Sequence, residues 1–242
     1  MNLAAGQAIW RRLMPRALRR AAAPMVTRVL RAYVHARARR PPGPAAPGLP
    51  IKLVGLFEAS HGISASARQA LRALQALGAP VEIVSLSGGA SDWARRLQAE
   101  TPASAWIFHL NPPELIAAMA CLDPRRVIGP RYGYWAWELP KAPKGWLTDA
   151  ALVDEVWTPS RYTADALAGA AAPVRVVPHP FFMEDYLSVE PAKRRAAFQA
   201  VALFDFNSSA ARKNPEGAIE AFRRAFADDV ACELTVKTQN GD

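Results

Sequence analysis

The sequence predicts an α/β fold in which parallel strands are joined by crossover helices. An apolar run at 153–157 is followed by Ser160, a favoured helix N-cap residue, and by a second, β-branched run at 174–177. A strand–helix–strand unit of this length is typical of a parallel sheet. The 242 residues are 51% hydrophobic, which is enough for one sizeable core, or for one domain and part of another.

Further elements of the same kind precede that unit. Continuous apolar runs bounded by turn residues predict strands, and apolar side chains on one helical face predict helices. The expected elements are strands at 51–57, 81–86 and 105–110 and helices at 65–77 and 114–121. The loop after the first strand contains His61 and Gly62, and open α/β sheets hold ligands at this carboxyl edge. The sequence contains no GxGxxG, which disfavours a dinucleotide-binding dehydrogenase.

A second core is expected near the end of the chain. The segment 181–199 is predicted to connect the two parts and to contain a short helix. A strand at 200–206 then leads to a helix whose first turn holds Pro215, a favoured residue at that position. The next strand is expected at 232–238.

The beginning of the chain is strongly basic. Ten arginines and Lys52 precede the first acidic residue, Glu58. The net charge of +9 therefore belongs to this N-terminal arm, since the other 19 basic residues are outnumbered by all 21 acids. A nucleic-acid-binding function would depend on the arm alone, because the rest of the chain has no net positive charge. No nucleic-acid partner is therefore expected.

The arm, residues 1–40, is predicted to be helical in two pieces that are broken at Pro24. The second piece has one apolar face, formed by Val26, Val29, Leu30 and Tyr33. A basic amphipathic helix fits the surface of an anionic membrane, and the alternative is an arginine-rich segment that is solvated or disordered. A proline-rich linker at 41–50 follows, so the folded domain is expected to begin at Ile51.

Cysteine usage and hydropathy argue against several classes of protein. Cys121 and Cys232 lie far apart without a histidine at metal-ligand spacing, which disfavours a disulfide framework or a zinc site and suits a reducing compartment. No apolar run approaches the ~20 residues that span a bilayer. Arginines interrupt any apolar segment near the N-terminus, which argues against a secretory signal. We expect a cytoplasmic protein, peripheral at the inner face of the membrane if the arm binds lipid.

An aromatic run with one acid follows residue 130. It consists of Tyr132, Tyr134, Trp135, Trp137 and Glu138, and prolines at 140 and 143 end it. Aromatic residues beside a carboxylate in a loop are typical of a sugar-binding surface, since ring faces stack on the C–H faces of pyranoses and the acid binds hydroxyls. The alternative is that the tryptophans are core residues.

The motifs WELP (137–140), DEVWTPS (154–160) and VRVVPHP (174–180) resemble the centre of family 4 retaining glycosyltransferases, and more narrowly the bacterial group 1 enzymes. FDFNSS and RKNP, further along, resemble the start of that family's donor-binding domain. The resemblance covers 51–242. It implies a GT-B fold with a Rossmann-like, acceptor-side domain at 51–180, followed by the beginning of a second Rossmann-like domain at 200–242 that binds a nucleotide-sugar.

The reaction implied by this resemblance is transfer of a hexose from a nucleotide-sugar to a glycan or lipid-linked acceptor, with retention of configuration. No metal or other cofactor is expected, since helix N-termini and basic side chains can neutralise the leaving diphosphate. The family's paired-glutamate motif should lie beyond Asp242, so we expect a fragment or a truncated copy. The alternative function is a non-catalytic carbohydrate- or partner-binding remnant of such an enzyme.

Ten residues are expected to form the site. His109 and Glu138 are expected to be catalytic, although a histidine in an apolar strand can also be a satisfied core residue. Acceptor binding is expected from three residues near strand ends, Asn111, Trp135 and Trp137. The resemblance implies donor binding at Gly62, whose backbone N–H groups can approach the diphosphate, and at four residues of the later loop, Ser208, Ser209, Arg212 and Lys213. Lys213 matches the family's phosphate-contacting lysine, and the family's preceding arginine falls at Ser208 or Ser209.

Overall fold

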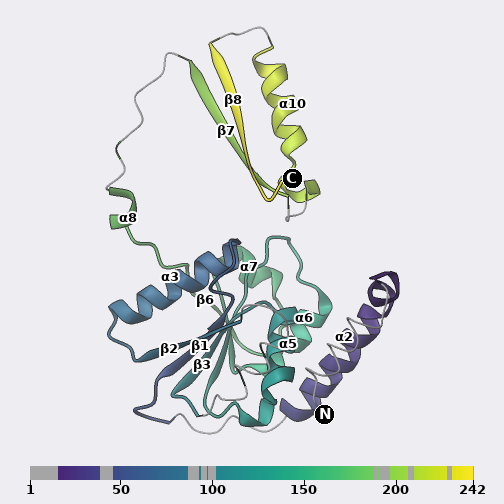
Figure 1. The fold of residues 1–242 in the computed structure, drawn as a ribbon, viewed down its shortest axis with the longest axis vertical. Helices are drawn as coiled ribbons and strands as arrows, with labels where there is room; N and C mark the ends of the chain where they lie inside the picture. Colours follow the sequence, from purple (N-terminus) through teal and green to yellow (C-terminus); the bar gives the residue numbers. More distant parts are fainter. Residues whose placement is uncertain are drawn as a thin grey trace. The chain divides into compact units, whose positions relative to one another are not determined.

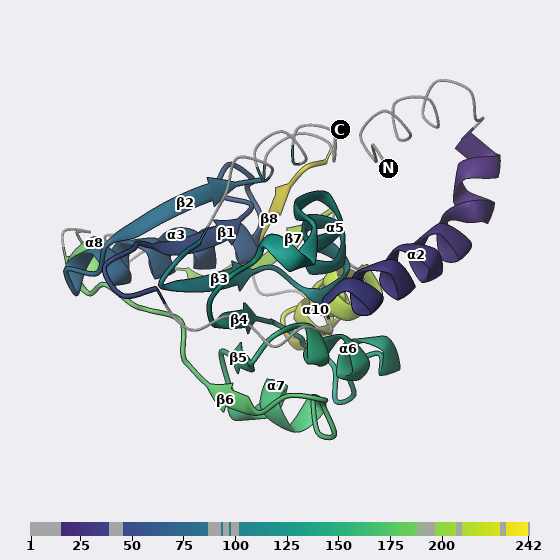
Figure 2. The same ribbon diagram turned by 90° about the horizontal axis from the view of Figure 1, so that it is seen from below.

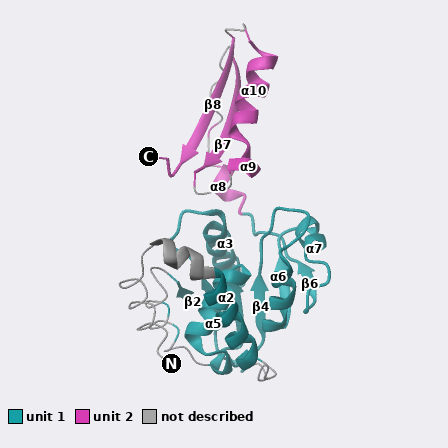
Figure 3. Cartoon of the chain, turned by 90° about the vertical axis from the view of Figure 1, so that its right-hand side faces the viewer, with its two compact units in different colours: residues 1–181 teal, residues 182–242 magenta. Residues whose placement is uncertain are grey.

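The computed structural model describes residues 16–38, 46–86, 93, 97, 102–187, 190, 197–206, 210–227 and 231–241, with helical side chains described from Pro24 onward. The chain divides into two compact units, which Figure 3 distinguishes by colour: unit 1 (1–181) and unit 2 (182–242). The division falls one residue beyond the predicted end of the N-terminal domain at 180.

Unit 1 is built on one parallel sheet of six strands, so the predicted α/β class is confirmed, and the arrangement is Rossmann-like (Figure 1). The strand order is β2-β1-β3-β4-β5-β6. The strands are β1 (Ile51–Gly55), β2 (Val81–Ser85), β3 (Ala105–His109), β4 (Arg131–Tyr134), β5 (Glu155–Thr158) and β6 (Val174–Val176). Because β1 pairs with both β2 and β3, the chain reverses its direction across the sheet after β2. Open α/β sheets bind ligands at such a switch point.

Helices cover both faces of the sheet. The connections contain α3 (Gly62–Ala76), α5 (Pro112–Leu122), α6 (Lys144–Asp149) and α7 (Arg161–Ala166), with 3-10 turns at Pro124–Arg126 and Ala150–Leu152. On one face α3 contributes to a small core with Leu53 and Ile107. The other face buries the larger core, where α2 (Arg16–Ala38) lies beside α5 (Figures 1 and 2).

Strand alternation decides which side chains reach each face, because successive residues point to opposite sides. Ile107 and Tyr132 pack on the α3 side. His109 and Tyr134 follow them by two residues and therefore lie on the same side, at the carboxyl ends of β3 and β4. Trp135 comes next in the chain and packs in the larger core on the opposite side. Because of this alternation, His109 and Tyr134 lie on one side of the carboxyl edge of the sheet and Trp135 lies on the other.

The expectation of a loop for the whole aromatic run is wrong at its start. Residues 131–134 form β4, which pairs with β3 and β5 inside the sheet. Tyrosines at alternate positions are favourable in a strand. Gly133 between them leaves room for the indole of Trp135, since a Cβ at Gly133 would lie 2.7 Å from Trp135 Nε1. The helix α6, which the sequence pattern did not indicate, starts after Pro143.

The arm also differs from its prediction. α2 runs without a break and contains Pro24 in its interior. Proline removes one backbone hydrogen bond but keeps a helical φ, so the helix continues past it. The C-terminal half of α2 belongs to unit 1, because Val34 and Ala38 are buried in the larger core. The folded part of the chain therefore begins within α2, before the predicted start at Ile51.

An ion-pair cluster fixes this docked half of α2. Asp149, at the end of α6, is fully buried. Arg31 donates from Nε to Asp149 Oδ1 at 2.9 Å and from Nη2 to Oδ2 at 3.0 Å. His35 Nε2 lies 3.0 Å from the same Oδ1. Arg31 thus compensates the charge of a buried carboxylate, which would otherwise be costly, and His35 adds a hydrogen bond to it.

The preceding part of α2 is solvent-exposed. Between Pro24 and Val29 every side chain is exposed, including the apolar Met25 and Val26. Figure 2 shows this end of α2 extending away from the sheet of unit 1. Among the described helices, none has the length and apolar character required to span a bilayer.

Unit 2 contains a β–α–β arrangement with two parallel strands, β7 (Phe198–Asp205) and β8 (Cys232–Gln239). They are joined by α9 (Ala210–Lys213) and α10 (Pro215–Ala225), and α8 (Glu184–Leu187) precedes them. Asn214, with φ 46°, is the N-cap of α10, and its Oδ1 accepts a hydrogen bond from the Gly217 amide at 3.2 Å. Pro215 is the first residue of α10, as the sequence predicts.

Candidate functional site

A cavity with several polar side chains in its wall lies at the carboxyl edge of the unit 1 sheet. Its volume is about 190 Å³. Its walls come from the start of α3, the ends of β3 and β4, and the segments after β4 and β6: Gly62, Ile63, Ser66, His109, Tyr134, Ala136, Glu138 and His179. The α3 helix starts after β1, so the cavity lies at the switch point between β1 and β3, where this class of sheet binds ligands.

One serine links two histidines in the wall of this cavity. Ser66 Oγ lies 2.8 Å from His109 Nε2 and 2.7 Å from His179 Nδ1. Tyr134 donates its hydroxyl proton to the Val177 carbonyl at 2.9 Å, and the same oxygen lies 3.0 Å from His179 Nδ1. The Tyr134 ring also stacks on His109, with ring centres 4.3 Å apart and planes 11° from parallel. We call Ser66, His109, Tyr134 and His179 the cavity network.

Burial keeps this network uncharged. It lowers the pKa of His109 to about 3, and the neighbouring His179 adds to the shift. Burial also lowers the pKa of His179 and raises the pKa of Tyr134. Both imidazoles and the phenol are therefore neutral near pH 7. His109 Nδ1 is buried without a hydrogen-bond partner among the described residues, so the cavity wall contains one unsatisfied polar atom.

The first turn of α3 contributes backbone to the cavity. His61 is the N-cap, and its Nδ1 accepts a hydrogen bond from the Ser64 amide at 3.4 Å. Gly62 and Ile63, the first two helical residues, line the cavity. A Cβ at Gly62 would meet no described heavy atom within 4 Å, so the backbone here is open to close approach.

Of the expected acceptor-binding residues, the structure places none on the cavity wall. Asn111 stands at the N-cap position of α5 without a side-chain capping bond. Its Oδ1 instead accepts a hydrogen bond from the Ala136 amide at 3.0 Å, so it positions the segment after β4. Trp135 is 0% exposed, so the expectation that its ring stacks on a sugar is corrected: it is a core residue. Trp137 is half-buried against Trp146, with ring centres 4.9 Å apart, and donates from Nε1 to the Lys141 carbonyl at 2.9 Å.

The expected catalytic residues do come together. His109 and Glu138 both line the unit 1 cavity, His109 in its buried wall and Glu138 in its exposed rim. Gly62, expected on the donor side, lines the same cavity. Among the described residues that line this cavity, Glu138 is the only acidic one.

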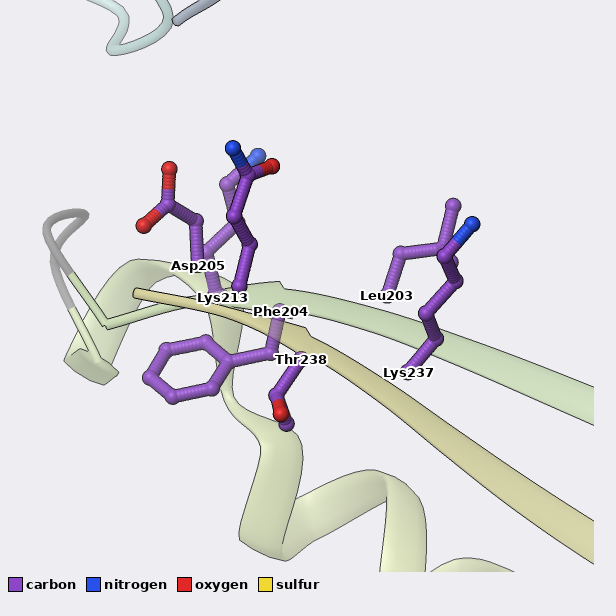
Figure 4. Close-up of a pocket in the computed structure, with 7 residues that line it drawn as sticks. Leu203, Phe204, Asp205, Lys213, Lys237 and Thr238 are labelled. Atoms are coloured by element: carbon purple, nitrogen blue, oxygen red, sulfur yellow. The ribbon is translucent and has the colours of Figure 1, made fainter. Parts of the chain in front are cut away.

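The donor-binding residues near the end of the chain lie in unit 2. Lys213 lines a second cavity of about 310 Å³ at the carboxyl ends of β7 and β8. Its other lining residues are Leu203, Phe204, Asp205, Lys237, Thr238 and Gln239. In Figure 4, Asp205 and Lys237 rise from one side of the two strands, and Phe204 points to the other. Arg212 belongs to α9 but does not line this cavity, and Ser208 and Ser209 lie outside the described residues.

Three members of the cavity network were not identified as site residues from the sequence. Tyr134 could have been found from strand alternation once β4 was recognised, because it shares a face with Tyr132. Ser66 lies one turn after Gly62 on α3, which places both on the side that faces the strand ends. His179 lies in the VRVVPHP motif, but nothing in the sequence around it indicates its contact with Ser66 of α3.

No group of three or more His, Cys, Asp or Glu side chains that could hold a metal ion occurs within the described ranges. Comparisons with protein-family models, curated proteins and solved structures find no match to the chain.

Proposed function

We propose that the protein is a retaining glycosyltransferase that transfers a hexose from a nucleotide-sugar to a glycan or lipid-linked acceptor. The observation that carries the proposal is the convergence of separate motifs on the unit 1 cavity. Glu138 comes from WELP and His179 from VRVVPHP, and both line the cavity beside His109. Motifs that resemble one enzyme family are expected to meet at its reaction site.

In this proposal unit 1 binds the acceptor. Glu138 supplies a carboxylate that accepts hydrogen bonds from sugar hydroxyls or takes a proton from one. His109 is neutral because of its low pKa, so it acts through hydrogen bonding and not through charge. Its stack on Tyr134 and its bond to Ser66 hold the ring in one orientation.

Unit 2 binds the donor in this proposal. Lys213 and Lys237 both line its cavity, at the strand ends. Charge builds on the diphosphate as it leaves, and a nearby ammonium group stabilises that charge more in the transition state than in the ground state. The chemistry proposed here requires no metal, because these cations can neutralise the leaving group.

Nucleotide binding tests the donor assignment. Calorimetric titration with UDP, GDP and their hexose derivatives should show weak binding to the chain, and Lys213→Ala should weaken it further, by about tenfold or ~1.4 kcal/mol. Lys144→Ala, at an exposed position at the start of α6, is the matched control and should bind normally. Transfer itself is followed as nucleotide release in the presence of glycan and lipid-linked acceptors.

The outcomes separate the two candidate functions. If no nucleotide or nucleotide-sugar binds, or if Lys213→Ala binds as well as the unchanged chain, the donor assignment is wrong. A chain that binds neutral sugars in unit 1 but ignores every nucleotide would be a carbohydrate-binding protein that does not catalyse transfer.

We further propose that the exposed part of α2 attaches the protein to an anionic membrane. Its support is the exposure of Met25, Val26 and Val29 next to Arg28, on a helix whose earlier turns hold further arginines. Each basic residue near such a surface contributes roughly 1 kcal/mol. Co-sedimentation with phosphatidylglycerol vesicles should therefore fall about fivefold in Arg28→Gln.

Arg161→Gln, in α7, is the control for that experiment and should sediment normally. Substitution is preferred to deletion of residues 1–50, because deletion would also remove the docked half of α2 and uncover the core. Equal sedimentation of Arg28→Gln and the unchanged chain, or equal binding to neutral phosphatidylcholine vesicles, would contradict membrane attachment through charge.

A further inference from the structure

The cavity network uses only one of the two ring nitrogens of His179. Its Nδ1 faces inward, 2.7 Å from Ser66 Oγ and 3.0 Å from the Tyr134 hydroxyl. Its Nε2 forms no hydrogen bond to any described residue. The two nitrogens lie on different sides of an imidazole, and His179 is an exposed residue that lines the cavity. Nε2 is therefore directed away from the buried network, to the open side.

Counting protons around Tyr134 assigns the tautomer of His179. The Val177 carbonyl can only accept, so the Tyr134 hydroxyl donates its single proton there. Toward His179 the Tyr134 oxygen can then act only as an acceptor. The 3.0 Å contact is a hydrogen bond only if Nδ1 carries the proton. A neutral imidazole has one N–H, so Nε2 of His179 is an unprotonated acceptor.

The rest of the network agrees with this assignment. The Nδ1–H of His179 also faces Ser66 Oγ, which therefore accepts from that side. Ser66 is then free to donate its own hydroxyl proton to His109 Nε2 at 2.8 Å. Each hydroxyl donates one proton and no two protons meet. The buried side chains thus fix the state of the nitrogen that faces the open side.

The remaining groups of the cavity indicate which ligand suits this acceptor. Of the described residues in the lining, none is Lys or Arg, and the charged one is the Glu138 carboxylate. A phosphate or carboxylate ligand would therefore find no lysine or arginine to pair with among these lining residues. Two hydroxyl groups of one ligand, in contrast, can donate one proton each, one to Glu138 and one to an unprotonated imidazole nitrogen. The lining therefore favours an uncharged, hydroxyl-rich ligand.

We propose that Nε2 of His179 accepts a hydrogen bond from a hydroxyl of an uncharged sugar bound in the unit 1 cavity. Ser66 and Tyr134 are positioning residues that hold the proton on Nδ1. The identity of the ligand as an acceptor sugar rests on the proposed glycosyltransferase function, whereas the tautomer of His179 does not.

Nitrogen NMR of the full chain labelled with ¹⁵N-histidine tests the tautomer directly. The four histidines give four pairs of ring-nitrogen signals, and the pair absent from His179→Asn belongs to His179. We expect a protonated Nδ1 and an unprotonated Nε2 near neutral pH. The chemical shifts themselves are measured on the unchanged chain, and His179→Gln provides a second, independent assignment of the His179 signals.

Methyl α-D-glucopyranoside and methyl α-D-mannopyranoside serve as uncharged probes, and glucose 6-phosphate as the charged comparison. Adding a glycoside should move the Nε2 signal of His179, and the sugar phosphate should bind more weakly.

Two substitutions distinguish the contributions of the two His179 ring nitrogens to glycoside binding. His179→Asn keeps an N–H near the Nδ1 position but loses Nε2, so it should bind the glycoside about tenfold more weakly. His179→Gln places an amide oxygen near the Nε2 position and should retain most of the affinity.

A proton on Nε2 of His179 would overturn the inference, and so would an Nε2 signal that neither glycoside moves. Tighter binding of glucose 6-phosphate would overturn the choice of an uncharged ligand. None of these results changes the outcome of nucleotide binding by Lys213 in unit 2, so failure of this inference and failure of the glycosyltransferase proposal are distinguishable.

Discussion

The cavities of unit 1 and unit 2 both lie at the carboxyl ends of parallel strands, but their walls are held differently. In unit 1, Ser66 and His109 are buried and bonded to one another, so the wall has its final geometry before a ligand arrives. In unit 2, Lys213 and Lys237 are exposed, and Leu203 beside them is 69% exposed. Ordering such side chains on binding costs about 0.5–1.5 kcal/mol each. The unit 1 cavity is preorganised, and changes in its wall should therefore affect stability as well as binding.

The largest effect is expected at Trp135, directly behind that wall. Trp135→Ala should lower the free energy of unfolding of unit 1 by about 3–5 kcal/mol, because it removes a fully buried indole. Leu203→Ala is the matched apolar truncation at an exposed site in unit 2. It should change the free energy of unfolding of unit 2 by less than about 0.5 kcal/mol. Urea denaturation followed by NMR signals from each unit measures both. Similar costs at the two sites would remove the distinction between the units.

The next largest effect is expected from removing a buried carboxylate, compared with removing an exposed one. Asp149→Ala leaves Arg31 and His35 without their buried carboxylate and should destabilise unit 1 by about 3 kcal/mol, with loss of the α2 contacts. Glu220→Gln in α10 removes an exposed bond to Arg224 and should cost only about 0.3–0.5 kcal/mol. Hydrogen exchange of the α2 amides distinguishes release of this helix from general destabilisation. Protected α2 amides in Asp149→Ala would show that apolar contacts alone hold the helix.

The smallest change in the free energy of unfolding is expected from a change of one pH unit. The pKa of His109 is about 3 in the folded chain and 6.5 in the absence of burial. Between these values the unfolded chain binds a proton that the folded chain does not. Lowering the pH through this window should therefore destabilise unit 1 by about 1.4 kcal/mol per pH unit, and the lowered pKa of His179 acts in the same direction.

All four histidines lie in unit 1, so unit 2 lacks this contribution. His109→Phe keeps a ring against Tyr134 and should reduce the pH slope of unit 1. Stability of the two units is measured by urea denaturation at a series of pH values. An unchanged slope in His109→Phe would mean that other groups cause it.

Much of the unit 1 fold could be predicted from the sequence, because every strand except β4 had a local pattern. The apolar runs at β1 and β3 and the Ser160 N-cap, whose Oγ accepts from the Thr163 amide at 3.2 Å, are local features. His109 and Glu138 could be expected at the cavity because His109 ends one strand and Glu138 follows another. These features depend on neighbours in the sequence.

The remainder depends on contacts between distant parts of the chain. Trp135 looks like a ligand-stacking residue in the sequence, but the strand before it directs it into the core. The docking of α2 depends on Asp149, which is 118 positions from Arg31. The link between Ser66 and His179 spans 113 positions. Such pairs have no periodicity or spacing by which one sequence could reveal them.

The close approach of Gly133 to Trp135 also restricts how this protein can evolve. A Cβ at Gly133 would lie 2.7 Å from the Trp135 indole nitrogen, well inside contact distance. A descendant with alanine at position 133 must therefore carry a smaller or differently turned side chain at 135. The two positions are predicted to change together during divergence, and a search for remote relatives can score them as one coupled pair.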